Sequence, residues 1–490
     1  MLLVLPIIVP MFMAAVLLLI PWVRVQRWGA HVGALAQLGC GVALFHRVSQ
    51  EGIQVLHVGG WRAPFGITLV ADTLSSILVV AVGVVGTAIT AFAFAGVDPR
   101  RESGGYHPLL MVLLMGVSGA FLTGDLFNLY VWFEVMLVAS FVLMALHRTT
   151  AQVRAAFLYV TLNLLSSSFL LTALGILYGQ SGTLNMADLS AAWQQNGPPR
   201  LHLPLAMLFL TAFGIKAALF PWFFWLPASY HTPPAAISAV FAGLLTKVGV
   251  YSMYRVFTLL FREVPSWVFV LIMVISAVTM VVGVTSALAQ RDFRRVLSFN
   301  LVGHIGYTTM GLGLLTPIAV AGSLLYVVHH IIAITNLYLV GGIFLRLRRG
   351  SEFERLGGLY RTYPVLSVVS MIPIFALAGI PPLSGFVAKV VLVKATFAAG
   401  AYWLGAVALA VGLLSVLSMA RLWDEGFWKP AAPDADKAKP IWPMVVPICA
   451  LTLLSLGISA AAEPLLQLTS RAADQLLNPE PYVRAVLKEP

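Results

Sequence analysis

Apolar stretches of about 20 residues follow one another from one end of this 490-residue chain to the other. A membrane interior admits only helical bundles and closed barrels, because every backbone polar group must be satisfied there. The stretches are continuous rather than alternating, which favours helices over barrel strands. Only 10% of the residues are charged, against about 25% in soluble domains. The sequence therefore predicts an all-α, polytopic membrane protein.

We expect about fourteen transmembrane helices and no soluble domain. The first stretch has no basic residues before it and contains Pro6 and Pro10, so it is predicted to be a spanning helix rather than a signal peptide. The expected helices lie at roughly 2–22, 29–47, 68–96, 106–124, 125–146, 152–178, 203–229, 233–260, 266–289, 292–315, 317–347, 364–396, 399–423 and 441–467. The stretch after about 468 is expected to be a polar tail.

Basic residues in the connections predict the orientation. If the connections alternate sides, about 18 Lys and Arg fall on one side, including Arg291, Arg294 and Arg295, and about 7 fall on the other. The richer side should be cytoplasmic, which places both termini outside. This distribution also explains the net charge of +11 without a nucleic-acid partner. Cys40 and Cys449 lie inside apolar stretches, so neither a disulfide nor a cysteine-bound metal is expected.

Glu134 lies about nine residues into an expected helix, with nothing basic within one helical turn. A charge at the centre of a bilayer costs at least about 2.5–3.5 kcal/mol, so a functional role is the default hypothesis. Its partner must come from another helix. The alternative is a purely structural ion pair between helices.

Two lysines lie beside expected helix breaks. Lys216 precedes Pro221 by about one turn, and Lys389 follows Pro381 and Pro382. Proline-broken spans in corresponding parts of two chain halves indicate a transport site at an inverted repeat. Each proline alone would predict no more than a kink.

Three further ionisable residues lie in mid-span. Lys247 is one, and His329 and His330 are the others. Adjacent positions point about 100° apart on a helix, so we expect one of the two histidines to face the polar interior. Either could instead be a hydrogen-bonded structural residue. His304 is a weaker candidate because it lies nearer a helix end.

Buried glutamate and lysine side chains suit proton movement, because burial favours the neutral form of each. An opposite charge nearby works against this effect. At about 7 Å and an effective dielectric near 20, such a pair is worth roughly 2.4 kcal/mol. Forming or breaking a Glu–Lys pair is therefore enough to load or release a proton.

Several long motifs resemble the antiporter-like subunits shared by Mrp cation/proton antiporters and respiratory complex I. They are GDLFNLYVWFEVML (124–137), KAALFPWFFWLP (216–227), GLLTKVGVY (243–251), QRDFRRVLSF (290–299) and GIPPLSGF (379–386). The resemblance covers nearly the whole chain. Within the family, GGWRAPFGITLVAD (59–72) is similar to the D-type subunits of the Mrp complex.

The resemblance implies two inverted five-helix repeats, at about 104–262 and 264–425. Three helices within 1–100 would precede them, and a last helix and short tail within 440–490 would follow. It further implies that Glu134 and Lys216 form a coupled pair, that Lys247 relays protons inward, and that Lys389 ends the path. A polar axis would connect the repeats through His329 or His330.

The resemblance also implies partners and a location. The chain would work with other subunits in a prokaryotic cell membrane and exchange H⁺ for Na⁺, without a cofactor or metal. Two alternatives stay open: a pumping subunit of a complex I-like or hydrogenase-linked oxidoreductase, and a passive scaffold. The sequence contains no flavin, haem or iron–sulfur ligand pattern, so no redox chemistry is expected in this chain.

This sequence departs from the family pattern in two places. Many relatives carry a lysine a few residues after the mid-span histidine, where this chain has Ile334, Thr335 and Asn336. The relay between Lys247 and Lys389 would then rely on water and these polar side chains. Relatives also often have an acidic residue where this chain has Ala228, which leaves the cytoplasmic entrance open.

Overall fold

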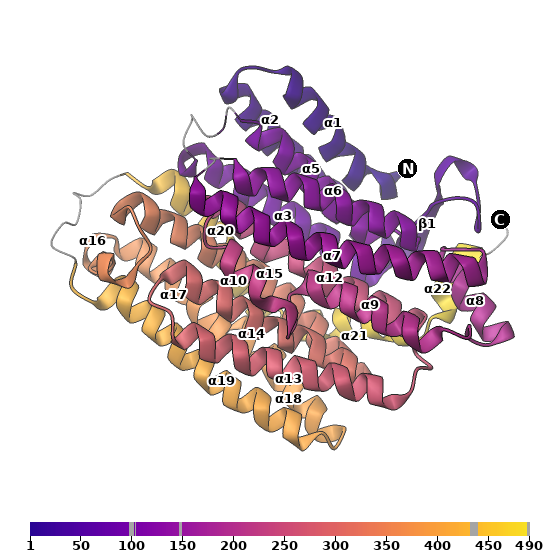
Figure 1. The fold of residues 1–490 in the computed structure, drawn as a ribbon. Helices are drawn as coiled ribbons and strands as arrows, with labels where there is room; N and C mark the ends of the chain where they lie inside the picture. Colours follow the sequence, from indigo (N-terminus) through magenta and orange to yellow (C-terminus); the bar gives the residue numbers. More distant parts are fainter. Residues whose placement is uncertain (98–101, 103, 147–148, 432–439, 488–490) are drawn as a thin grey trace.

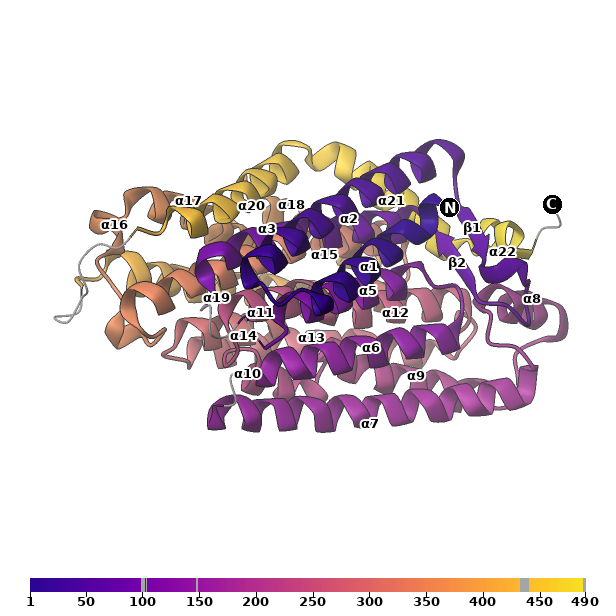
Figure 2. The ribbon, with the colours of Figure 1, turned by 90° about the horizontal axis from the view of Figure 1, so that it is seen from above.

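The computed structural model describes the chain except for residues 98–101, 103, 147–148, 432–439 and 488–490. Six of the basic residues counted above to predict the orientation lie outside this described part, namely Arg100, Arg101, Arg148, Lys437, Lys439 and Lys488. The described residues form one bundle of long helices that run back and forth (Figure 1). The N-terminus and the last described helix, α22 (Glu480–Leu487), lie at the same end of the bundle as the α8 helix (Met186–Asn196), as both views show (Figure 2).

The described helices give fourteen crossings, which confirms the predicted architecture. Nine crossings are single helices: α1 (Leu5–Leu19), α2 (Val23–Glu51), α3 (Thr73–Gly96), α5 (Tyr106–Leu122), α6 (Leu126–Ala145), α7 (Thr150–Ser181), α13 (Ser266–Leu288), α14 (Phe293–Leu314) and α15 (Pro317–Arg348). The tenth is α19 (Tyr402–Trp423). Four are composite: α9 (His202–Ala217) with α10 (Trp225–Ser229), α11 (Ala235–Val240) with α12 (Thr246–Leu259), α17 (Pro364–Ala378) with α18 (Ser384–Ala398), and α20 (Trp442–Ala460) with α21 (Ala462–Leu477). Among the described residues, eleven helical stretches, some of them composite, are long and apolar enough to span a membrane.

A small β-hairpin replaces the start of the expected third helix. Strand β1 (Gln54–His57) pairs antiparallel with β2 (Thr68–Ala71). The helix begins only at Thr73, because Asp72 forms a capping box with Ser75. Sequence hydropathy could not separate these four buried and mostly apolar strand residues from the helix that follows them.

The expected polar tail is wrong. Helix α21 continues the last span after a break at Ala461 and packs along α15. Its buried face includes Ala472 and Ala473, and Gln475 Oε1 accepts a hydrogen bond from Thr73 N at 3.0 Å. A final helix, α22 (Glu480–Leu487), packs on α8. The charged face of α21 gave this segment the composition of a tail.

Two connections match each other at opposite ends of the bundle. Asp125 caps α6 and forms a β-bridge with Asn185, whereas Asp292 caps α14 and forms a β-bridge with Glu352. The first lies near α8 and the second near α16 (Leu359–Thr362), which Figure 1 shows at the two ends of the molecule. Equivalent caps at opposite ends are what an inverted arrangement requires.

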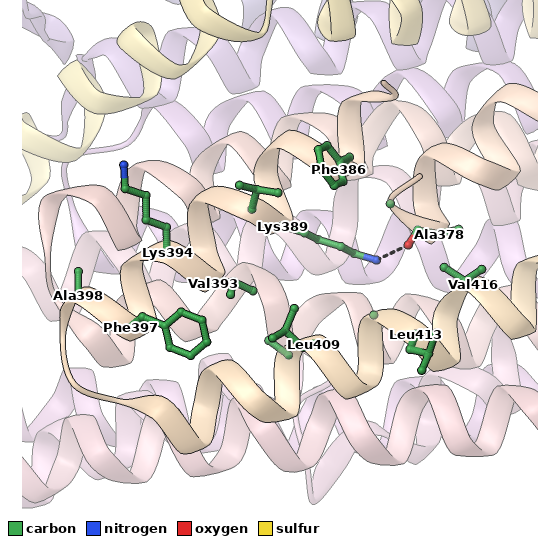
Figure 3. A pocket seen from close by; sticks show the side chains of 14 residues that line it. Ala378, Phe386, Lys389, Val393, Lys394, Phe397, Ala398, Leu409, Leu413 and Val416 are labelled. Carbon is green, nitrogen blue, oxygen red and sulfur yellow. Dashed lines mark hydrogen bonds between the residues drawn. The ribbon is translucent and has the colours of Figure 1, made fainter. Parts of the chain in front are cut away.

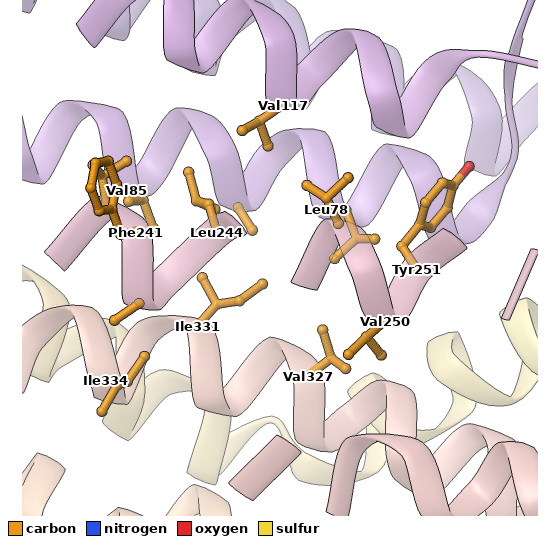
Figure 4. Packing of buried hydrophobic residues seen from close by; sticks show 14 of the residues in the cluster. Leu78, Val85, Val117, Phe241, Leu244, Val250, Tyr251, Val327, Ile331 and Ile334 are labelled. Carbon is orange, nitrogen blue, oxygen red and sulfur yellow. The ribbon is translucent and has the colours of Figure 1, made fainter. Parts of the chain in front are cut away.

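The core is a continuous apolar layer in which α11–α12 lies between α3 and α15 (Figure 4). Leu78 of α3, Leu244 and Val250 of the α11–α12 segment, and Ile331 of α15 are all buried. Lys247 and both mid-span histidines belong to these central helices. The fold therefore holds these ionisable groups in the middle of the molecule.

Candidate functional site

A serine joins Glu134 to Lys216. Glu134 lies on α6, Ser167 on α7 and Lys216 on α9, and these helices pack in that order. The Ser167 hydroxyl donates a hydrogen bond to Glu134 Oε1, while Lys216 Nζ donates to Ser167 Oγ at 3.1 Å. The two charges are thus coupled through a hydroxyl rather than in direct contact. Ser167 was missed by sequence reasoning, and its only signal was the run of three serines at 166–168.

Lys216 lies in the last turn of α9, next to a cavity of about 20 Å³ that Tyr159, Asn163 and Trp225 help to line. Its ammonium also donates to Asn163 O at 3.3 Å. A space of this size suits roughly one water molecule. The Trp225 indole N–H donates to Ile215 O at 3.0 Å, which ties α10 to α9 across the break around Pro221.

Lys247 is fully buried beside a π-helical turn at 241–245. Its ammonium donates to Ala242 O at 2.5 Å, an acceptor that the wider turn leaves accessible. Helix α12 approaches the end of α9 closely at Gly249, where an added Cβ would lie 2.7 Å from Ala217 N. Lys247 is therefore held two residues from a close contact with the Lys216 segment.

Aromatic and histidine rings of α14 and α15 form a buried cluster. His304 Nδ1 hydrogen-bonds the Tyr326 hydroxyl, and the His304 and His330 ring centroids are 5.1 Å apart. The Tyr307 and Tyr326 rings stack at 5.2 Å. His304, ranked weaker from its position near a helix end, lies inside this buried cluster. The two tyrosines were not predicted, because buried aromatic residues are common in any core.

His329 and His330 both lie in buried, polar surroundings, whereas we expected only one to do so. His329 Nδ1 is 2.8 Å from Ser384 Oγ at the start of α18, and His330 faces His304 on α14. Ser384 Oγ in turn lies 3.3 Å from Ser455 Oγ on α20. Because adjacent helix positions point about 100° apart, the two rings contact different partners. Neither ring faces the membrane.

Lys389 lies on α18, after the break that contains Pro381 and Pro382. Its ammonium donates to Leu377 O at 3.1 Å and Ala378 O at 2.8 Å, the last carbonyls of α17 (Figure 3). These acceptors are free because a helix end leaves carbonyls unpaired, and the end also carries partial negative charge. Lys216 lies in the helix before its break, whereas Lys389 lies in the helix after its break.

A groove of about 690 Å³ between α18 and α19 runs past Lys389. Its walls are mostly apolar, with Phe386, Phe397 and Leu413 among them. The Lys389 side chain points toward Ala378, whereas Lys394 is exposed and points away (Figure 3). The two lysines of α18 therefore have different surroundings.

The polar residues after the histidine pair point in different directions. Thr335 packs against Gly243, next to the Lys247 turn, and its buried hydroxyl has no hydrogen-bond partner among the described residues. Asn336 Nδ2 instead donates to Thr452 Oγ1 on α20 at 2.8 Å. Both His330 ring nitrogens likewise lack a partner in the described part of the chain. Buried polar groups of this kind are sites where ordered water is expected.

Arg255 has a buried partner that sequence reasoning missed. It forms an ion pair with Asp72, which caps α3. The Tyr251 and Tyr482 rings lie 5.4 and 5.0 Å from its guanidinium carbon. This contact links α3, α12 and the C-terminal α22. The Asp72 position was noted only as part of a motif.

Arg294 does not lie in a connection as expected. It is buried in the first turn of α14, where its guanidinium donates to Pro233 O at 2.5 Å and Ser238 Oγ at 2.6 Å. Counting basic residues by connection cannot distinguish an arginine that pins two helices together from one exposed to solvent. Removing Arg294 from the count leaves the asymmetry between the two sides intact.

Comparisons with known proteins agree with this architecture. A family model described as "NADH:quinone oxidoreductase/Mrp antiporter, TM" matches residues 123–417. The D-type subunit of the Na⁺/H⁺ antiporter from Alkalihalophilus pseudofirmus is 41% identical over 100% of this chain and 99% of its own length. The like-named protein from Bacillus subtilis is 37% identical over 99% of each.

Solved structures share the fold from end to end. A chain of the Mrp complex from Dietzia sp. superposes with a TM-score of 0.91 at 30% identity, over 99% of each chain. A chain of the archaeal membrane-bound sulfane sulfur reductase also gives 0.91, at 26% identity and the same coverage. The motifs, the fold and the relatives agree, and this polytopic membrane protein belongs to the NADH:quinone oxidoreductase/Mrp antiporter transmembrane family.

Proposed function

We propose that this chain is the proton-translocating subunit of a multisubunit Na⁺/H⁺ antiporter. Family membership and the full-length relatives named as D-type antiporter subunits support this assignment. The observation that carries it is the hydrogen-bonded series Glu134–Ser167–Lys216, which couples two buried ionisable groups through a hydroxyl. A hydroxyl that donates to one group and accepts from the other can pass on a change in protonation.

The proposed path starts at Glu134. When Glu134 takes up a proton, Lys216 loses its counter-charge, and its ammonium becomes an isolated buried ion, which burial disfavours. Lys216 then releases its proton toward Lys247, across the contact at Gly249. Glu134 then passes its proton through Ser167 to Lys216. This transfer returns both groups to their charged forms.

The second half of the path runs from Lys247 to Lys389. Thr335 and the two mid-span histidines, with water between them, form the proposed relay. Lys389 ends it at the last carbonyls of α17. We assign the two halves to repeats at about 104–262 and 264–425, after three helices within 1–100 and before a final segment within 440–490.

The proposed location is a prokaryotic cell membrane with both termini outside. The basic connections support this orientation, because the arginine-rich side is expected to be cytoplasmic. The termini lie together at the opposite end of the bundle (Figure 1). Other subunits are proposed partners, because the full-length relatives are named as antiporter subunits and the superposed chains come from multisubunit complexes.

The test is Na⁺-dependent collapse of a pH gradient in inverted vesicles from a host without its own antiporters. We expect collapse when the chain is expressed with its partner subunits and none when the chain is omitted. Antiport by the purified chain alone in liposomes would contradict the need for a complex.

The oxidoreductase reading has one specific support, the equal structural match to the sulfane sulfur reductase chain. Mild-detergent purification separates the two assignments, because small hydrophobic partners would support the antiporter and iron–sulfur subunits the oxidoreductase. A scaffold role predicts that no substitution at Glu134 changes transport.

A further inference from the structure

A second large cavity lies beside the α10 segment, and its wall includes Ala228, where relatives often carry an acidic residue. It measures about 860 Å³ and is bounded by the first turns of α7, the α10 segment and the start of α14. These elements meet at the arginine-rich side of the bundle. The cavity reaches the surface, because Arg154, Phe224 and Arg295 in its wall are exposed.

The mouth of this cavity carries uncompensated positive charge. Neither the Arg154 nor the Arg295 guanidinium forms an ion pair or hydrogen bond with a described residue. None of the described residues that line the cavity is acidic. The Asp292 carboxylate, three residues before Arg295 in the chain, already accepts from Arg295 N at 2.8 Å and Ser351 Oγ at 2.6 Å.

His231 lies within the same positive field. It lies in the connection between α10 and α11, lines the cavity, and donates from Nδ1 to Pro227 O at 2.8 Å. Burial, and then the charge of Arg295, lowers the pKa of His231 to about 4. This histidine is therefore neutral at physiological pH and adds no charge of its own to the cavity.

Part of the cavity wall is apolar. Leu158, Phe223, Phe224 and Phe299 line it, and they offer hydrocarbon and aromatic surface to whatever enters past the arginines. A basic mouth above an apolar wall between transmembrane helices fits a molecule with an anionic head and a hydrocarbon tail. Free phosphate would leave the apolar wall unused, and a zwitterionic lipid would leave the two arginines uncompensated.

We propose that this cavity binds an anionic phospholipid, with its phosphate on Arg154 and Arg295 and an acyl chain against Phe223, Phe224 and Phe299. The lipid would brace the α10 segment from outside. That segment carries Trp225, whose indole ties it to α9 beside the Lys216 cavity. Binding itself does not depend on the proposed antiport function, so the two can fail separately.

The test uses the intact complex in phosphatidylcholine nanodiscs with increasing phosphatidylglycerol, and measures bound lipid by native mass spectrometry. R154Q/R295Q should weaken phosphatidylglycerol binding roughly 30-fold, which corresponds to about 2 kcal/mol for two interfacial arginines. R154K/R295K should keep much of the affinity, because the charges remain. The matched control is R291Q/R361Q, which removes two exposed arginines of the same side that do not line the cavity.

Three results would overturn the proposal. Equal binding of phosphatidylcholine and phosphatidylglycerol would show that the charges select nothing. Displacement by millimolar inorganic phosphate would show a simple anion site. An equal loss in R154Q/R295Q and in R291Q/R361Q would show a general surface-charge effect rather than a site.

Discussion

The two lysines beside the helix breaks are stabilised in different ways. Lys216 reaches a carboxylate through Ser167, whereas Lys389 donates only to the last carbonyls of α17 among its described hydrogen bonds. A carboxylate can be neutralised by one proton, but a helix end keeps its partial charge at any pH. The first lysine therefore has a partner that can switch, and the second has a fixed one. This difference suits a loading site and a terminal site.

The switchable partner should matter most. Glu134→Gln mimics a permanently protonated carboxylate, so we expect antiport to fall by at least about 10²-fold, the range typical of a lost proton-transfer group. Glu134→Asp keeps the charge but shortens the side chain, and should retain part of the activity with a shifted pH optimum. Both are measured as Na⁺-dependent pH-gradient collapse in inverted vesicles, with complex content checked on the same preparation. Normal transport by Glu134→Gln at wild-type abundance would make the contact purely structural.

The partner of Lys389 is the end of α17, whose partial charge does not change with pH. We therefore expect substitution of Lys389 to reduce antiport severely and equally at all pH values. Lys389→Ala should reduce antiport by about 10²-fold while the complex still assembles. Lys394 on the same helix is the control, because its side chain is exposed and can extend to the membrane interface. Equal losses for Lys389→Ala and Lys394→Ala would remove the distinction between the two positions.

The bridging serine offers a finer test of the first site. Ser167→Ala leaves both charges but removes the hydroxyl between them, so we expect antiport to fall by about tenfold, in keeping with the loss of a hydrogen bond to charged groups. Ser168→Ala is the matched control, since that exposed hydroxyl donates only to Leu164 O within its own helix. If both variants transport equally, the serine is not part of the coupling.

The smallest predicted effect separates two neighbours on α15. Thr335→Val removes a buried hydroxyl beside the Lys247 turn that has no partner among the described residues. The variant should slow antiport by roughly twofold to threefold, because the relay loses a group that binds water. Asn336→Leu breaks a contact with α20 and should affect thermal stability of the complex more than transport rate. The reverse ranking, measured by initial rates and unfolding temperatures, would redirect the relay toward α20.

Much of this architecture was predictable from the sequence, for a physical reason. Hydrocarbon thickness sets helix length, and charge in a membrane is rare, so spans and the isolated ionisable residues such as Glu134 and Lys247 stand out. Hydropathy does not predict the structure of short apolar strands or of amphipathic helices. The strand at Thr68–Ala71 has the hydropathy of a helix, and the part of the amphipathic α21 after about residue 468 has the composition of a polar tail.

Contacts across helices could not be predicted in the same way. A serine within an apolar helix usually bonds its own backbone, so nothing in the sequence distinguished Ser167 from Ser168. The partner of Arg255 is 183 residues away, at Asp72. His304 lies in the ring cluster because α14 and α15 pack side by side. These contacts depend on tertiary structure and leave no local signal.

The central claim is that Glu134 changes protonation during transport while it is coupled to Lys216. Infrared difference spectroscopy on the reconstituted complex, on adding Na⁺, observes a carboxyl group directly. We predict a protonated-carboxyl band that changes with Na⁺, is absent in Glu134→Gln, and is shifted in Ser167→Ala but not in Ser168→Ala. A band that is the same in wild type and Glu134→Gln would contradict the account.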